Sequence, residues 1–225
     1  MSKPNIELIE ECIEVVLNQK RFDRVFEFYS HNAVLHTPPY VGLGITADDR
    51  SGHKVFLREV APSGPAYEKL LPGDELIRVQ DHDRAWETFD ELRNGLWGQG
   101  VLGTPITVTV RRENQQFEIP LVRGRVNGWD IHLNRVVDVW EAEIKNHWPD
   151  MRVEIKLILG QGDLVSCYLL NSGTNTEFHH TAIWSELDIF RIQNHRITET
   201  WGVEDTNAEL KQLGFRTTEP VKELA

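Results

Sequence analysis

The residues best suited to ligand chemistry stand together at Gly42, Leu43, Gly44, Ile45 and Thr46. Glycine lets the backbone turn so that consecutive amide N–H groups point at one position, which is how a backbone binds a carboxylate. The alternative is that the two glycines only make a tight turn.

Other residue types that could do chemistry are less promising. His179 and His180 are adjacent, and neighbours on a strand face opposite ways, so we expect no metal site there. Cys12 and Cys167 are the only cysteines, and each stands among apolar residues. We expect two buried free thiols, which is typical of a reducing cytosol.

Composition narrows the possible partners. The chain has 225 residues, 40% of them hydrophobic, and a formal net charge of −11. Binding to nucleic acid needs a basic face, so nucleic acid is not an expected partner. No apolar run approaches the roughly 18 residues that cross a bilayer, and the N-terminal residues lack an apolar signal core. We therefore expect no membrane partner and a cytoplasmic location.

The elements that must position these residues fall into two kinds. Apolar spacing predicts helices over residues 6–17, 22–29, 133–148 and 207–213, with Asn5 as an N-cap. Strands are expected at 33–36, 151–159, 164–170, 183–192 and 196–203, with a hairpin turn at 193–195. Between Pro39 and Trp129 the strands are short, at 43–45, 55–57, 75–79, 106–110 and 117–121, with one helix at about 87–96. This pattern predicts the α+β class.

The short-strand segment resembles a PDZ peptide-binding domain of the type in bacterial proteases. Its motifs are Tyr40-Val-Gly-Leu-Gly-Ile45, Val60-Ala-Pro-Ser-Gly-Pro-Ala66, Leu71-Pro-Gly-Asp-Glu-Leu-Ile77 and Gly103-Thr-Pro-Ile-Thr-Val-Thr-Val-Arg111. They resemble the GLGF-type loop, "V-x-x-G-S-P-A", "L-x-x-G-D-x-I" and "G-T-x-V-x-L-x-V-x-R". The resemblance implies a PDZ domain over 40–124. It also implies that a peptide adds as a strand beside residues 43–46, with its last side chain in an apolar pocket.

The flanks resemble the SnoaL-like polyketide cyclase (ester cyclase) family, which has a cone-shaped curved sheet with packed helices. The motifs are Leu35-His36-Thr-Pro38, His147-Trp-Pro-Asp-Met151, Asn171-Ser-Gly-Thr-Asn-Thr-Glu-Phe178, and the run from Phe190 to Trp201 followed by Glu204-Asp205 and Leu210-Lys-Gln-Leu-Gly214. The implied organisation is a discontinuous cone domain at 1–39 and 125–216, interrupted by the insert and followed by a tail at 217–225.

The resemblance to this family also implies a chemistry. A carboxylate removes a proton next to a carbonyl in an apolar cone, a donor stabilises the enolate, and neither metal nor organic cofactor is needed. Asp205 would be the base, His36 would stabilise the oxyanion or orient substrate, and Asn175 replaces the motif's histidine with a group that donates but cannot titrate. Four aromatic residues would line the pocket: Trp140, Tyr168, Trp184 and Trp201. Dimerisation through the open sheet face is also implied.

Each of these residues has a structural alternative. Asp205 could cap the following helix, His36 could be a core histidine, and the tryptophans could be core residues. Two functions remain open. One is a cyclase or isomerase acting on a small carbonyl or ester compound, with the insert binding a peptide or covering the pocket. The other is a non-catalytic homodimeric ligand-binding or scaffold protein that recruits the C-terminus of a partner.

Overall fold

The structure is a computed structural model that describes residues 2–48, 53–82, 84–93 and 96–215. The chain divides into two compact units, one made of residues 1–36 and 130–225 and the other of residues 37–129. Each unit is described separately.

The first unit begins with helices. Helix α1 (Ser2–Cys12) continues into the π-helical η1 (Ile13–Asn18), and a short turn η2 (Phe22–Arg24) leads into α2 (Val25–Phe28). The predicted N-cap at Asn5 is wrong, because α1 already begins at Ser2. Pro4 is tolerated in the first turn, where its missing N–H has no partner to lose. The side chain of Asn5 donates instead to the Gly162 carbonyl at 3.2 Å.

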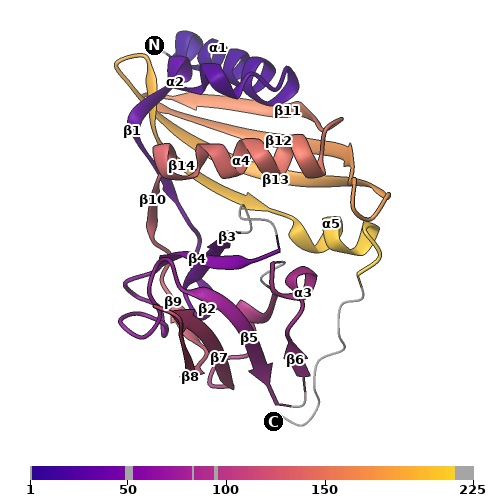
Figure 1. The fold of residues 1–225 in the computed structure, drawn as a ribbon. Coiled ribbons are helices and arrows are strands. Elements are labelled where there is room, and N and C mark those ends of the chain that lie inside the picture. The colour runs from indigo at the N-terminus through magenta and orange to yellow at the C-terminus, as the bar shows by residue number, and fades with distance from the viewer. Residues whose placement is uncertain (1, 49–52, 83, 94–95, 216–225) are drawn as a thin grey trace. The chain divides into compact units, whose positions relative to one another are not determined.

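A six-stranded sheet follows, with the order β10-β1-β14-β13-β12-β11 (Figure 1). Its strands are β1 (Tyr29–His36), β10 (Asp130–His132), β11 (Arg152–Gln161), β12 (Leu164–Thr174), β13 (Thr181–Gln193) and β14 (Arg196–Glu204). Strand β1 pairs in parallel with β14, and the other pairs are antiparallel. The predicted hairpin turn is confirmed: Asn194 and His195 have φ of 51° and 59° and join β13 to β14. Strand β1 starts at Tyr29, which the sequence had placed on a helix.

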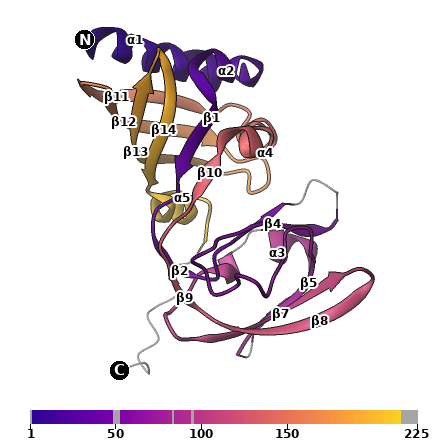
Figure 2. The same ribbon diagram turned by 90° about the vertical axis from the view of Figure 1, so that its left-hand side faces the viewer.

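Two helices complete this unit. Helix α4 (Leu133–His147) lies against the same side of the sheet as α1, and the two helices share one buried core with β11–β14 (Figure 2). Helix α5 (Thr206–Gln212) follows β14. Helices packed on one side of a largely antiparallel curved sheet confirm the predicted α+β class.

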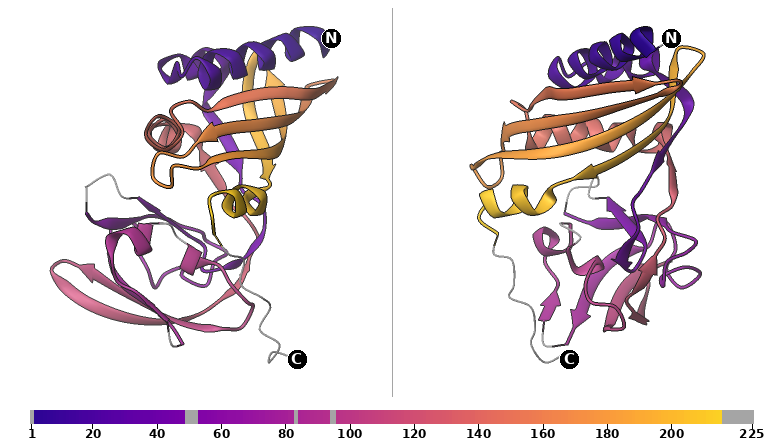
Figure 3. Two further views of the ribbon diagram at one scale, coloured as in Figure 1. Left: turned by 90° about the vertical axis from the view of Figure 1, so that its right-hand side faces the viewer. Right: turned by 180° about the vertical axis from the view of Figure 1, so that it is seen from behind.

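The two sides of the sheet differ in what covers them. On β12, Val165, Cys167 and Leu169 are buried, whereas Tyr168 between them is 43% exposed. None of the helices described for this unit covers this second side (Figure 3). Large apolar side chains are exposed on it: Leu157, Leu159, Tyr168, Ile183, Leu187, Ile189 and Val203. Both cysteines are free and buried, as predicted.

The second unit is a smaller β-rich body. Strands β3 (Ile45–Asp48), β4 (Val55–Val60), β5 (Glu75–Asp81), β7 (Pro105–Arg112) and β8 (Gln115–Val122) form a sheet in that order, and β6 (Arg84–Trp86) pairs with β5. Strands β2 (Tyr40–Gly42) and β9 (Gly124–Val126) form a separate pair. Helix α3 (Phe89–Arg93) is shorter than the helix predicted over 87–96, of which residues 94–95 lie outside the described part, and the turn η3 spans Leu96–Gly98.

One buried ion pair explains a motif of this unit. The Asp74 side chain is 1% exposed and accepts a hydrogen bond from the Leu71 amide at 2.9 Å. It also accepts two hydrogen bonds from the Arg112 guanidinium, each of 2.7 Å. A two-pronged pair of this kind holds a turn to a strand. The acid of the "L-x-x-G-D" motif is therefore structural here.

Within the described residues, no helix is long and apolar enough to cross a membrane.

Candidate active site

A cavity of about 500 Å³ lies in the first unit, between the covered side of the sheet and the helices. Its walls come from Ile9 and Cys12 of α1, Trp140 of α4, and Leu169 and Phe190 of the sheet, with other apolar residues beside them. The volume is in the usual range for a small-molecule site. None of the described residues that line it is Lys or Arg.

Two carboxyl groups face this cavity from β13. Glu186 and Asp188 are two residues apart on a strand, so they point to the same side, and their side chains are hydrogen-bonded to each other. Burial, and then the nearby Glu186, hold the pKa of Asp188 well above its ordinary value. Two carboxyl groups this close cannot both ionise at low cost. The surroundings of Asp188 therefore favour its neutral form.

The neighbours of the pair fix its geometry. Asn171, which is 1% exposed, donates from Nδ2 to Glu186 Oε2 at 2.7 Å. Gly202 faces Asp188 across the β13–β14 ladder, and a Cβ at Gly202 would lie 2.5 Å from Asp188 Oδ1. The absence of a side chain at residue 202 therefore makes room for the Asp188 carboxyl group.

Hydroxyl groups of Tyr29 and Thr200 also belong to the cavity wall. Burial raises the pKa of the Tyr29 phenol well above its ordinary value, so Tyr29 stays a neutral donor. Burial likewise raises the pKa of the Cys12 thiol to about 12, so Cys12 is not a nucleophile. The site therefore contains acid, base and neutral donors within an apolar enclosure.

The structure does not place Asp205 in this cavity, and the predicted base is corrected accordingly. Asp205 is exposed and is the N-cap of α5, where its Oδ1 accepts the Ala208 amide at 3.0 Å. An aspartate at this position satisfies a helix-terminal N–H that would otherwise lack a partner. Asp205 therefore caps a helix, which is the structural alternative given for it above.

His36 lines the cavity, but both of its ring nitrogens are occupied. Nδ1 lies 2.7 Å from Asp130 Oδ1, and Nε2 lies 3.0 Å from Glu199 Oε2. The ring also stacks on Trp201, with centroids 4.4 Å apart. No nitrogen is left to reach a substrate oxygen, so the predicted oxyanion role is corrected to a structural one.

Asn175 is buried in a turn outside the cavity, where its Oδ1 accepts the amides of Glu177 and Phe178 at 3.0 and 3.2 Å. Of the four predicted pocket aromatics, Trp140 lines the cavity, whereas Trp201 stacks on His36 and is not among the lining residues. Trp184 packs on Trp148 in a separate core, and Tyr168 is on the opposite side of the sheet. The catalytic assignment of Asn175 and the pocket assignments of Trp184, Trp201 and Tyr168 are therefore corrected.

The two carboxyl groups were missed although a sequence signal existed. Trp184, Glu186, Asp188 and Phe190 alternate along one strand, so two acids share a face with two large apolar residues. Acidic residues seldom occur on a buried face unless they are paired. Within the described residues, no group of three potential ligands could hold a metal ion.

In the second unit, the loop at residues 42–46 has the expected backbone turn. Gly44 has φ of +78°, and a Cβ there would lie 2.8 Å from Gly64 Cα, so only glycine fits. Leu43 is fully buried in the unit's core, and Ile45 packs against that core. Strand β3, which begins at Ile45, is at the edge of its sheet.

Comparisons with known proteins report only structural likeness. IdmH of Streptomyces antibioticus, described as a proposed polyketide cyclase, is 16% identical, with 95% of this chain and 99% of that chain covered and a TM-score of 0.49. AclR of Streptomyces galilaeus, a proposed hydroxylase, is 12% identical, with 95% and 87% covered and a TM-score of 0.49. A proposed SnoaL-like polyketide cyclase from Jannaschia sp. CCS1 is 8% identical, with 96% and 95% covered and a TM-score of 0.47.

No family model matches the chain, and no curated protein matches its sequence. Because the structural likenesses lie below 25% identity and below a TM-score of 0.5, they carry no argument about the site.

Proposed function

We propose that the first unit is a cofactor-independent enzyme of the cyclase or isomerase type, which moves a proton on a small carbonyl or ester compound. The observation that carries the proposal is the pair of hydrogen-bonded carboxyl groups, Glu186 and Asp188, in an apolar cavity of about 500 Å³. Such a pair provides a base and an acid side by side at neutral pH.

The two carboxyl groups have different roles in this reaction. The Glu186 carboxylate, held by Asn171, takes a proton from the carbon next to the substrate carbonyl, and the C–H electron pair moves into the enolate. Once Glu186 holds this proton, it no longer accepts from Asp188, and the O–H of Asp188 turns to donate a hydrogen bond to the developing enolate oxygen. The enolate carbon then attacks a second carbonyl within the substrate, whose oxygen receives the proton from Glu186, or it is reprotonated at another carbon.

Deuterium exchange at an activated carbon tests the proton transfer without knowledge of the natural substrate. 2-Tetralone in D₂O is a suitable probe, because it is apolar and its exchange is followed by NMR. We expect the wild-type chain to accelerate exchange, and we expect Glu186→Gln to lose at least about 100-fold of that acceleration. Wild-type exchange equal to that of Glu186→Gln would reject the proposal.

A matched control comes from a distant carboxyl group. Glu154 of β11 is exposed, pairs with Lys156 at 2.7 Å, and does not line the cavity. Glu154→Gln removes the same charge as Glu186→Gln, and its exchange rate should equal that of the wild type. Equal losses in both variants would show that net charge, and not the base, controls exchange.

We further propose that the second unit is a PDZ-like module that takes up an extended peptide beside β3. The support is the edge position of β3, the left-handed Gly44 and the buried Leu43. An edge strand offers main-chain hydrogen bonds to an added strand. Display of random peptides, both internal and C-terminal, against the full chain tests this, and failure to select any binder would reject it.

A homodimer is also proposed, through the exposed side of the first unit's sheet. The support is the set of seven large apolar side chains that this side exposes, from Leu157 to Val203. Contiguous exposed apolar surface on a folded protein commonly marks an interface.

A further inference from the structure

Tyr40 lies directly on the glycine loop of the second unit. A Cβ at Gly42 would be 2.6 Å from Tyr40 Cε2 and 3.0 Å from Cδ2, so the ring covers Gly42. Pairing of β2 with β9 holds the backbone of Tyr40 opposite Val126. The Trp129 ring lies beside the Tyr40 ring, with centroids 6.3 Å apart. The aromatic ring is thus fixed in place by backbone pairing and by its neighbours.

The three amides that could bind an anion at this loop already have acceptors. The Leu43 amide donates to the Gly98 carbonyl at 3.0 Å. The amides of Gly44 and Ile45 both hydrogen-bond to the phenol oxygen of Tyr40. A neutral oxygen of the chain itself therefore occupies the point where the backbone turn would hold a carboxylate oxygen.

The loop has little freedom to supply other donors. The Gly44 carbonyl accepts the Ala61 amide at 2.7 Å, and the Leu43 carbonyl accepts the Ala66 amide at 3.1 Å. Gly44 and Gly64 approach so closely that no side chain fits between them. A carboxylate can gain the amides of Gly44 and Ile45 only if the Tyr40 hydroxyl leaves.

We propose that Tyr40 determines the specificity of this groove: its hydroxyl replaces a terminal carboxylate, so the wild-type edge of β3 accepts an extended internal segment and excludes a free C-terminus. The inference rests on the proposed peptide uptake, because it states which peptides can enter. It differs from the expectation that the groove recruits a partner's C-terminus. The exclusion has two parts, occupied donors and the volume of the phenol oxygen.

Tyr40→Phe removes both parts at once and leaves the ring. Phenylalanine keeps the ring over Gly42 but removes the oxygen, so it frees two amides with little change in packing. The probes are N-acetyl-valyl-leucine and its C-terminal amide, titrated into the full-length chain while the amide resonances of Gly44 and Ile45 are followed by NMR. We expect Tyr40→Phe to bind the free acid at least tenfold more tightly than the wild type does, and to bind the amidated probe no better.

Tyr67→Phe is the matched control, because Tyr67 lies in the same unit and is 47% exposed. It should behave as the wild type. Should Tyr40→Phe fail to fold, Tyr40→Leu is used in its place. Equal affinity of the wild type and the Tyr40 variant for the free acid, including no binding by either, overturns the inference. If display selects no peptide but the Tyr40 variant binds the free acid, the proposed uptake fails and the role of Tyr40 stands.

Discussion

At the scale of single residues, the proposed chemistry depends on one proton shared by two carboxyl groups. The β13–β14 ladder places Glu186 opposite Glu204 and Asp188 opposite Gly202. Burial, and then the negative charge of Glu186 and Glu204, disfavours ionisation of Asp188 and raises its pKa. A group held neutral in this way costs the folded protein stability at neutral pH.

This cost predicts how stability changes with pH. The folded pKa of Asp188 lies above the unfolded value of about 3.9, so its contribution to stability is complete below that value and is lost as pH rises toward the folded pKa. Asp188→Asn keeps a donor toward Glu186 but cannot ionise. The difference in free energy of unfolding between Asp188→Asn and the wild type should therefore shift in favour of the variant by more than about 1 kcal/mol between pH 4 and pH 7.5. Urea unfolding at both pH values measures this, and a constant difference would contradict it.

Gly202 offers a second prediction at this scale. A methyl group at residue 202 would come within 2.5 Å of Asp188 Oδ1, so Gly202→Ala must displace the carboxyl group. We expect 2-tetralone exchange to fall at least about tenfold, while circular dichroism stays unchanged. Retention of full exchange would show that the position of Asp188 does not matter. Gly162→Ala does not serve as a control, because Gly162 has φ of +64° and alanine would be strained in that backbone conformation.

At the scale of elements, α5 is the clearest case of a local role for a residue that the sequence suggested as catalytic. Asp205→Ala removes the N-cap, so we expect a loss of about 1 kcal/mol in the free energy of unfolding and no change in exchange. Thermal unfolding and the 2-tetralone assay measure the two effects. Loss of exchange without loss of stability would return the catalytic role to Asp205.

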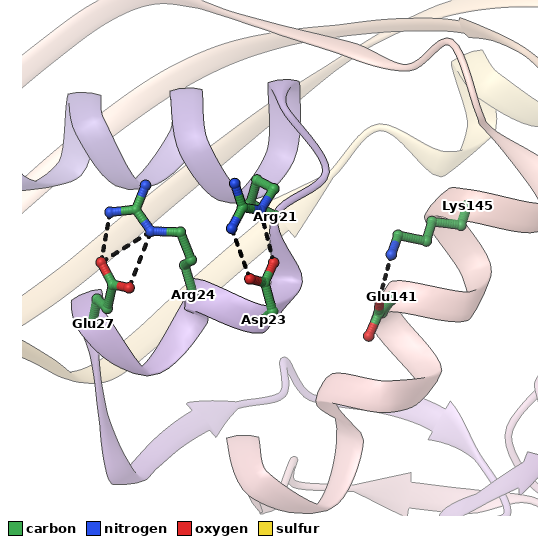
Figure 4. Close-up of polar contacts among 6 residues, drawn as sticks. All are labelled: Arg21, Asp23, Arg24, Glu27, Glu141 and Lys145. Atoms are coloured by element: carbon green, nitrogen blue, oxygen red, sulfur yellow. Dashed lines mark hydrogen bonds and ion pairs between the residues drawn. The ribbon is translucent and has the colours of Figure 1, made fainter.

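The surface ion pairs at η2, α2 and α4 are expected to contribute little to stability. Arg24–Glu27, Arg21–Asp23 and Glu141–Lys145 all lie on the surface of the first unit (Figure 4). Because solvent screens such pairs, Glu141→Gln should lower the free energy of unfolding by less than about 0.5 kcal/mol. Denaturant unfolding checks this, and a larger loss would indicate that α4 needs the pair to stay folded.

Most elements could be predicted because each has a local signal. Apolar residues alternate along 151–159, which indicates a strand with one buried face, and the structure has β11 there. Apolar residues recur every three to four positions along 133–148, which indicates a helix, and the structure has α4 there. The start of β1 could not be predicted, since Tyr29 continues the apolar spacing of α2 and only pairing with β14 makes it a strand residue. The site was missed for a related reason: which side of β13 faces the cavity depends on α1 and α4, far away in the sequence.

At the scale of the whole molecule, the chain has two compact units with separate cores and separate proposed sites. The proposed homodimer belongs to this scale. If the exposed side of the sheet is the interface, Leu159→Glu should convert a dimer to a monomer without lowering the stability of the unit, because Leu159 is 59% exposed. Sedimentation equilibrium measures the mass, and a monomeric wild type would contradict the proposal.

The central claim is that burial and the neighbouring Glu186 hold the Asp188 carboxyl group in its neutral form. Carboxyl ¹³C NMR of the full chain, with resonances assigned through Asp188→Asn and Glu186→Gln, measures this directly. We predict that the Asp188 carboxyl shift at pH 7 is that of the neutral acid and that it titrates well above the ordinary range for aspartate. An Asp188 resonance that titrates near pH 4 would contradict the account.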